Sequence, residues 1–491
     1  MSHADHRPTR PARRERRVRR QRSGRFEMTM VVAVVLVIVV AGALALDRSG
    51  SWSQPTAGPA TAALSRAAVV CPPTGESSGS DETATGAGTV LAASLGGASG
   101  DLSVSGDGAT GADQSVSVDA DTPAEVEAGS GSVVLSARGD LAAGLVAGRS
   151  TRGPLAATDC GAPTAEEWFT GLGAGAVHDS TLDLTNPNSG AAVVDVTVLT
   201  RSGEVDVSSL RGIAVPGGST RSFDLLSLLH RRGMIALHTV VTRGEVVASV
   251  RDRSTHLTGK GGSSEWLAGQ EQPARSNLLL GLPDNASSST LTIANPGENQ
   301  VTATLKLVTP SAVLTPADAP EISIAPSSVV SVDLGDVLSG DAAEDAYGIE
   351  VTGSGAVTAA LRTVRAGDLA LTTPSAQVSA RTAVLTPVGV GTKQVLLAGA
   401  TGVGVVTVVS RAADGSELDS TKVAIKQQQG AVVDVPRAAA MVEIEPRRTR
   451  VAASVLLAGR GRRGAAVVPF RELVTAAEVP SVQPGLVTAG G

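Results

Sequence analysis

The most widespread pattern in this 491-residue chain is the alternation of apolar and polar residues. Residues 194–198 alternate in this way, as do 302–307 and 321–324. A period of two places every second side chain on one face of a strand and is typical of half-buried antiparallel strands. Asn-Pro and Pro-Gly-Gly turns separate such stretches. The pattern therefore predicts an all-β protein.

Several motifs recur along the chain at a spacing of about 100 residues. Leu-x-Leu-x-Asn-Pro ends at Asn186 and Pro187, and it returns as Leu-x-Ile-x-Asn-Pro at Asn295 and Pro296. An aspartate near the end of each unit recurs as Asp224, Asp333 and, more faintly, Asp434. We infer four repeated units, because self-similarity at a fixed period indicates a repeat architecture.

Short strands in units of this size are typical of β-sandwiches. We predict one N-terminal transmembrane helix followed by tandem immunoglobulin-like β-sandwich modules. The predicted segments are a cytoplasmic Arg-rich tail (1–27), the transmembrane helix (28–46), a linker (47–66) and modules at 67–160, 161–262, 263–376 and 377–484.

The repeated polar residues have structural interpretations. An Asn side chain before Pro bonds backbone ahead of it while Pro fixes φ, which makes a turn. Asp224, Asp333 and Asp434 follow predicted strands, where a carboxylate can cap the exposed N–H groups of a helical turn. Metal or ligand contact is the alternative for these aspartates.

The N-terminus predicts a membrane topology. Residues 1–27 hold ten Arg against three acids, and the nineteen residues 28–46 carry no charge. A helix of that length spans about 29 Å, close to the hydrocarbon thickness of a bilayer. Arginines on one side place the N-terminus in the cytoplasm and the rest of the chain outside. A signal peptide cleaved near 41–45 is the alternative interpretation.

Charge and cysteine content agree with an exported protein. Outside the first 27 residues, 31 basic and 44 acidic residues give a net charge near −13, which disfavours nucleic acids as partners. The two cysteines, Cys71 and Cys160, favour a disulfide in an oxidising compartment, with free thiols as the alternative.

Aromatic residues are rare, at 2% of the chain. Trp168 and Phe169 belong to a Glu-Trp-x-x-Gly motif that returns 98 residues later at Trp266. We interpret these rings as plugs at the ends of sandwiches. The alternative is an exposed platform for stacking sugars, in which Trp168, Phe169 and Trp266 contact the ligand.

No catalytic, metal or cofactor site is predicted. Residues 75–79 and 459–464 match a nucleophile elbow and a dinucleotide fingerprint in letters, but the strand and helix context that each requires is missing. The histidines are scattered singly. Asp119, Asp121 and Glu125 could hold Ca²⁺ weakly, although an acidic loop is the simpler interpretation.

Taken together, the Trp-Phe-x-Gly and Leu-x-Leu-x-Asn-Pro motifs, the Arg-rich tail and the two cysteines resemble a family of membrane-anchored secreted actinobacterial proteins of unknown function. The resemblance is strongest over 160–365 and implies a cell-envelope setting without assigned catalytic residues. We therefore expect a non-enzymatic envelope protein of the cell membrane. Its expected partners are the membrane, cell-envelope glycans or a membrane protein; the alternative roles are carbohydrate binding and service as an accessory subunit of an envelope glycosyltransferase.

Overall fold

β-strands make up most of what the computed structural model describes. The described residues are 24–49, 60–75, 88–111, 114–229, 232–255, 262–459 and 464–479. Most of the predicted tail and part of the predicted linker lie outside them. Helix α1 (Gly24–Ser49) belongs to one unit of the chain, and residues 62–477 form another. Among the helices described, none is both long enough and apolar enough to cross a membrane.

Four successive sets of strands make up the larger unit. The first comprises β2 (Arg66–Cys71), β3 (Thr89–Ser94), β4 (Gly100–Ser105), β5 (Gln114–Val118), β6 (Ala124–Val126), β7 (Val133–Arg138), β8 (Leu145–Arg152) and β9 (Leu155–Asp159). One sheet has the order β2-β7-β4-β5 and the other β6-β3-β8-β9. Numbered within the set, these orders are 1-6-3-4 and 5-2-7-8.

The next two sets follow the same order when the short strands β13 and β14, and likewise β22 and β23, are counted together as the fourth position. The second comprises β10 (Glu166–Gly175), β11 (His178–Thr185), β12 (Ala192–Thr200), β13 (Gly203–Val205), β14 (Ile213–Val215), β15 (Thr220–Asp224), β16 (Met234–Arg243), β17 (Val247–Thr255) and β18 (Gly262–Leu267). The third comprises β19 (Ala274–Leu280), β20 (Ser288–Asn295), β21 (Val301–Val308), β22 (Val313–Leu314), β23 (Ile322–Ile324), β24 (Ser328–Asp333), β25 (Gly348–Arg365) and β26 (Asp368–Thr372). Strand β25 is long enough to supply both the sixth and the seventh position.

The fourth set completes the series. It comprises β27 (Gln377–Val378), β28 (Thr382–Leu385), β29 (Thr392–Ala398), β30 (Gly404–Arg411), β31 (Glu417–Ile425), β32 (Ala431–Asp434), β33 (Met441–Arg447), β34 (Val451–Ala458) and β35 (Ala465–Pro469). Its sheets are β28-β33-β30-β31 and β27-β34-β29-β32, with β35 on β34. The remaining elements are β1 (Ala60–Ala63), β36 (Ala476–Val479), the helices α2 (Leu225–Leu229) and α3 (Gly335–Ser339), and the 3-10 turns η1 (Gly139–Gly144), η2 (Ser208–Leu210) and η3 (Asp341–Ala343).

The prediction of an all-β protein is confirmed, but the strand order is not that of an immunoglobulin domain. In immunoglobulin domains the seventh strand pairs with the sixth. Here it pairs with the second strand, as β8 does with β3 and β17 with β11. The alternating residues recognised in the sequence fill the cores as expected: Val194, Val196 and Val198 are buried from one face of β12.

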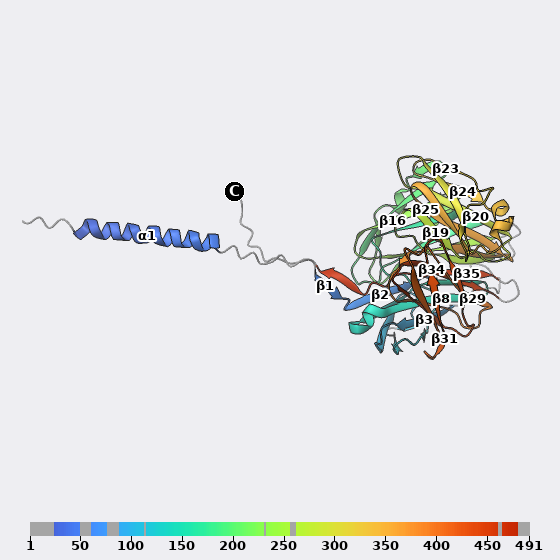
Figure 1. Ribbon diagram of the computed structural model, residues 1–491, viewed down its shortest axis with the longest axis horizontal. Helices are drawn as coiled ribbons and strands as arrows, with labels where there is room; N and C mark the ends of the chain where they lie inside the picture. Colours follow the sequence, from blue (N-terminus) through green and yellow to red (C-terminus); the bar gives the residue numbers. More distant parts are fainter. Residues whose placement is uncertain are drawn as a thin grey trace, which may run out of the picture. The chain divides into compact units, whose positions relative to one another are not determined.

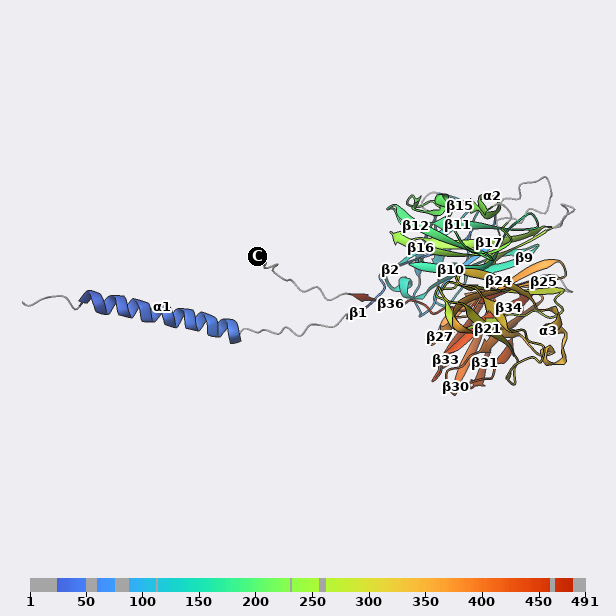
Figure 2. The same ribbon diagram turned by 90° about the horizontal axis from the view of Figure 1, so that it is seen from above.

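The last strands of the four sets meet at one place. Strand β9 lies against β18 and β35, and β26 lies against the same two strands, so the four sets close into a ring. Figure 1 separates the second and third sets (β16, β20, β24) from the first and fourth (β3, β8, β29). Figure 2 separates the second (β11, β15, β17) from the fourth (β30, β31, β33). The two views agree with a ring in which each set has two neighbours.

Apolar residues seal each junction of the ring. Val70, Val134 and Val247 join the first set to the second. The second meets the third around Trp168, the third meets the fourth around Tyr347, and the fourth meets the first around Met441. The described β region is therefore one connected body.

A disulfide joins Cys71 at the end of β2 to Cys160 just after β9, as predicted. It ties together the first and last strands of the first set across 89 residues. Both sulfur-bearing residues are buried in the core of that set.

Replacing both cysteines by serine is expected to lower the free energy of unfolding by about 4–5 kcal/mol, because a cross-link over this separation restricts the unfolded chain. Chemical denaturation of the full-length protein measures the change. Reductant should destabilise the unaltered protein and leave the double variant unchanged. An equal response of both proteins to reductant would contradict the prediction.

Candidate functional site

The repeated asparagines form the same turn twice. The Asn186 amide donates to Gly190 O and Val215 O, and its Oδ1 accepts from Asn188 N. The Asn295 amide donates to Asn299 O and Ile324 O, and its Oδ1 accepts from Gly297 N. Each of these contacts of Asn186 has its counterpart 109 positions later, and Asn295 also donates to Ala325 O. Together with Pro187 and Pro296, these side chains hold a strand connection.

The repeated aspartates fall into two groups. Asp224 Oδ1 accepts from Leu226 N at 3.0 Å, and Asp333 Oδ1 accepts from Gly335 N at 2.8 Å, so both carboxylates hold the start of a short helix. Asp434 differs, because it ends β32 and accepts from Gln394 Nε2 across the sheet. The cap expected at Asp434 is therefore wrong.

The three aromatic residues considered as ligand contacts are buried within the four-sandwich body. Trp168 and Trp266 are 7% and 6% exposed, and Phe169 is 1% exposed. Trp168 stacks on His238 with 4.0 Å between ring centroids and packs between the second and third sets. Trp266 Nε1 donates to Pro73 O of the first set at 3.0 Å. Neither indole offers an exposed face to a sugar, and both seal junctions between sandwiches instead of the ends of one.

The two Trp motifs are not equivalent in structure. Trp168 lies in the first strand of the second set, whereas Trp266 lies in β18, which pairs with β17 as the last strand of the same set. The predicted boundary after residue 262 therefore cuts through the second sandwich. The spacing of 98 residues, against 109 for the Asn turns, reflects this difference.

A charged cluster lies where the last strands meet. Arg471, just after β35, has its Nε 3.0 Å from Asp159 Oδ2 and its Nη1 3.7 Å from Glu167 Oε1. Its Nη2 donates to Gly269 O at 3.1 Å. One guanidinium at the end of the fourth set thus joins the end of the first set to both ends of the second. Burial alone would lower the pKa of Arg471, but the carboxylates of Asp159, Glu167 and Glu271 together raise it.

Glu167 is the acid of this cluster that titrates near neutrality. Its side chain is buried, and burial raises its pKa to about 7 while Arg471 opposes the shift. A Cβ on Gly269 would come within 2.1 Å of Glu167 Oε1, so only glycine leaves room for the carboxyl group there. Asp159 and Glu271 contribute further to the raised pKa.

Two more acids hold the free edge of β9. Glu265 Oε1 accepts from Ala157 N, and Asp368 Oδ2 accepts from Leu155 N, both at 3.3 Å. Burial raises the pKa of Glu265 well above its usual range and that of Asp368 to about 6. These carboxyl groups replace the strand partner that β9 lacks on this edge.

Asp252 gathers a histidine and a serine between strands. His178 Nε2 lies 2.6 Å from Asp252 Oδ2, and Ser180 Oγ donates to the same oxygen at 2.7 Å. Arg362 Nε lies 3.7 Å from Oδ1. A nucleophilic serine needs the histidine as its base, but here both groups contact the carboxylate and Ser180 Oγ accepts from Gly173 N. The arrangement is that of a structural network.

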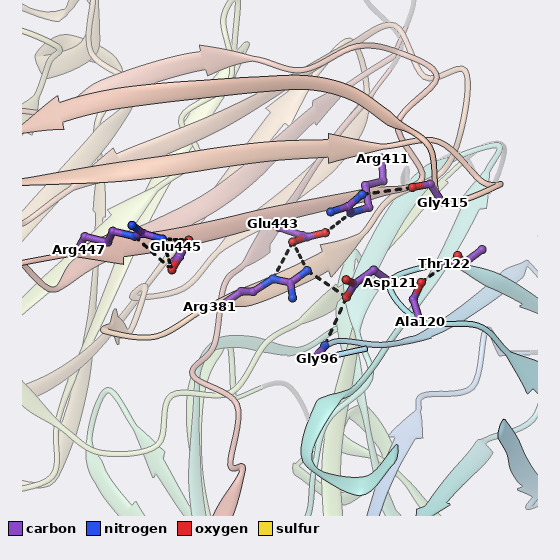
Figure 3. A network of polar contacts seen from close by, with 10 residues as sticks. All are labelled: Gly96, Ala120, Asp121, Thr122, Arg381, Arg411, Gly415, Glu443, Glu445 and Arg447. Atoms are coloured by element: carbon purple, nitrogen blue, oxygen red, sulfur yellow. Dashed lines mark hydrogen bonds and ion pairs between the residues drawn. The ribbon is translucent and has the colours of Figure 1, made fainter. Parts of the chain in front are cut away.

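The acidic loop proposed as a weak Ca²⁺ site joins two sandwiches instead. Asp121 Oδ1 lies 3.0 Å from Arg381 Nη2, and Arg381 also binds Glu443 Oε2 at 2.6 Å (Figure 3). Arg411 completes the network on Glu443 Oε1. Across the parts of the chain that the structure describes, no group of three or more His, Cys, Asp or Glu side chains could hold a metal. Of the two letter matches to catalytic motifs, 76–79 and 460–463 lie outside the described residues.

The charged cluster at the centre was missed from the sequence. Glu167 and Glu265 do precede the two tryptophans, and Asp159 precedes Cys160, so a signal existed beside each motif. Arg471 follows the last strand with no motif around it. Only the closure of the ring brings it to residues more than 200 positions away.

Comparison with known proteins places this chain in a family. Residues 119–436, well over half of the chain, match the model described as a family of unknown function, DUF5719. The chain belongs to this family. The predicted resemblance to a family of unknown function is therefore confirmed. The matched residues include all of the second and third sets and most of the fourth.

Comparisons with curated proteins and with solved structures give no further information on function. A search of curated proteins finds no match. Among solved structures, the full-length RrgB pilus protein of Streptococcus pneumoniae aligns at 8% identity with a TM-score of 0.11, covering 63% of this chain. This chain spans 64% of the length of that pilus protein. A similarity at this level carries no argument about fold or function.

We expect Glu167→Gln to change how stability depends on pH. The pKa of Glu167 is about 7 in the folded protein and about 4.5 unfolded, so the folded state binds the extra proton between these values. Its contribution is complete below about pH 4.5 and is lost as pH rises through 7. The free energy of unfolding of the unaltered protein should fall relative to that of the variant across this window, by on the order of 3 kcal/mol.

Chemical denaturation at pH 5, 6, 7 and 8 measures the difference. Glu298→Gln is the control, because Glu298 is exposed in the turn between β20 and β21. A constant difference between the unaltered protein and Glu167→Gln over this range would show that the Glu167 carboxyl group titrates as in water.

Proposed function

We propose that this protein is a membrane-tethered, extracytoplasmic component of an actinobacterial cell envelope with a structural or interaction role. The observation that carries the proposal is the closed ring of four sandwiches. Each junction is sealed by apolar residues, and the buried charges at its centre bind backbone or one another. Such a body holds a fixed outer surface, which suits a scaffold.

The hydrogen bonds of the repeated polar residues also support a structural role. Asn186, Asn295, Asp224 and Asp333 all serve turns and helix starts. Asp252, which brings a serine and a histidine together, uses both to satisfy its own carboxylate. These residues are therefore committed to holding backbone and neighbouring strands.

Sequence and the disulfide support the location. Residues 28–46 carry no charge and follow ten arginines, which is typical of a membrane anchor with a cytoplasmic N-terminus. The bond between Cys71 and Cys160 suits an oxidising compartment outside the membrane. Recognition of glycans through Trp168 and Trp266 is not part of the proposal, because both rings are buried.

The location is tested in intact cells that express the full chain. Cells are treated with a maleimide–polyethylene glycol reagent after denaturation, with and without prior reduction. We expect labelling of Cys71 and Cys160 only after reduction. A variant lacking residues 28–46 should stay in the cytoplasm and label without reduction. Labelling of the unaltered chain without reduction would contradict the proposed location.

The structural role is tested on the purified full chain. Incubation with a cell-envelope preparation is expected to release no product above the level seen with Asp252→Asn. Product release that Asp252→Asn or Ser180→Ala abolishes, in variants of unchanged stability, would show that the protein is an enzyme.

A further inference from the structure

A cavity of about 700 Å³ opens between the third and fourth sets, beside the centre of the ring. Its size lies within the range of about 300–1,000 Å³ typical of small-molecule sites. Three connecting segments contribute to its lining: the connection from the second set to the third (269–274), the connection from the third set to the fourth (374–377), and the turn between β31 and β32 (427–428). The rest of the lining comes from residues 276–278, 313, 350, 398–400 and 469–471. Of the motifs recognised in the sequence, only Gly269, which ends the motif at Trp266, lies in this lining.

Carboxamide side chains dominate the polar lining. They are Gln270, Gln272, Asn277, Gln377, Gln427 and Gln428. The carboxamides of Gln270 and Asn277 are bonded to one another and to backbone. The other four can both donate and accept hydrogen bonds, which matches hydroxyl groups that do the same. We call this space the amide cavity.

Two polar atoms of the lining have no hydrogen-bond partner among the described residues. They are Ser375 Oγ and Gln377 Oε1, both buried. Ser375 is only 8% exposed. Gln377 is held in place because its Nε2 donates to Gly399 O at 3.0 Å. A buried polar group without a partner costs free energy, and a bound ligand that supplies the partner would recover it.

The charges of the lining favour a neutral ligand. Glu271 and Glu350 contribute two carboxylates. Among the described residues that line the cavity, Arg471 is the one cation, and Asp159 and Glu167 already hold it. An anionic ligand would face these carboxylates without a free cation to bind it.

The apolar side chains of the lining are mostly small. It consists largely of Ala and Pro, with Leu278 and Val313 as larger side chains. Phe470 lines the cavity but is fully buried, so it offers no ring for stacking. Such a surface suits the C–H faces of sugar rings better than the bulky side chains of a peptide.

We propose that the amide cavity binds a segment of a neutral glycan. Ser375 and Gln377 hydrogen-bond its hydroxyl groups. The inference specifies a ligand class for the interaction role proposed above, and it rests on that role for where the glycan would be met.

The test uses calorimetric titration of the full chain in lipid nanodiscs. The probes are linear tetrasaccharides of glucose, mannose, galactose and arabinose, with tetragalacturonate and the capped peptide acetyl-tetra-alanine-amide for comparison. We expect one or more of the neutral sugars to bind, and neither the anionic sugar nor the peptide.

Variants locate the site. Ser375→Ala and Gln377→Met should each weaken binding by about five- to tenfold, because each removes one hydrogen bond to the ligand. Ala376→Trp should abolish binding by filling the cavity from an exposed position. Gln300→Met is the matched control, since Gln300 is exposed and lies outside the lining. Thermal unfolding of each variant verifies that it is folded.

Three results would overturn the inference: no neutral tetrasaccharide binds, the peptide binds in preference, or Ser375→Ala, Gln377→Met and Ala376→Trp leave binding unchanged. The proposed function fails separately, through the labelling or product-release experiments. If the labelling experiment places the protein in the cytoplasm but the sugars still bind, the proposed location is wrong and the proposed binding site stands.

Discussion

The closure of the ring depends on how the edge strands at its centre are satisfied. A sandwich whose last strand ends at a sheet edge leaves N–H and C=O groups without partners. Here β9 turns such an edge inward, where the carboxyl groups of Glu265 and Asp368 accept from Ala157 N and Leu155 N. The second and third sets thus supply the hydrogen bonds that the first set lacks. Two sandwiches thus complete the edge of a third, and its backbone N–H groups give the buried carboxyl groups of Glu265 and Asp368 a partner.

The aromatic residues that carry a polar atom also lie where two sets meet. The β region has few aromatic residues, yet the three that carry a polar atom all lie at junctions. Trp168 packs between the second and third sets, Trp266 donates to Pro73 O of the first, and Tyr347 Oη donates to Leu397 O of the fourth. A large ring fills the space between two sheets, and the N–H of Trp266 and the O–H of Tyr347 each bond the backbone of a neighbouring set. Val, Ala and Leu suffice inside each sandwich.

The sequence predicted local structure well and the assembly poorly. The period of two, the Asn-Pro turns and the cysteine pair depend on neighbouring residues or on a simple count, and each was confirmed. The Asn turns share their main contacts because both asparagines bond backbone 29 positions ahead. Ring closure joins Arg471 to Gly269 and Leu155 to Asp368, which no local pattern encodes. Trp266 was assigned to the wrong sandwich because two similar motifs were aligned by letters, although their spacing disagreed with that of the turns.

The central claim is that four sandwiches behave as one body held at the last strands. Hydrogen–deuterium exchange of the full chain, followed by mass spectrometry, measures it on peptides covering β9, β18, β26 and β35. The ring predicts that all four strands exchange slowly and at one common rate set by global unfolding. Rapid exchange of β9 while β18, β26 and β35 stay protected would show that the first sandwich separates from the rest, and it would contradict the ring.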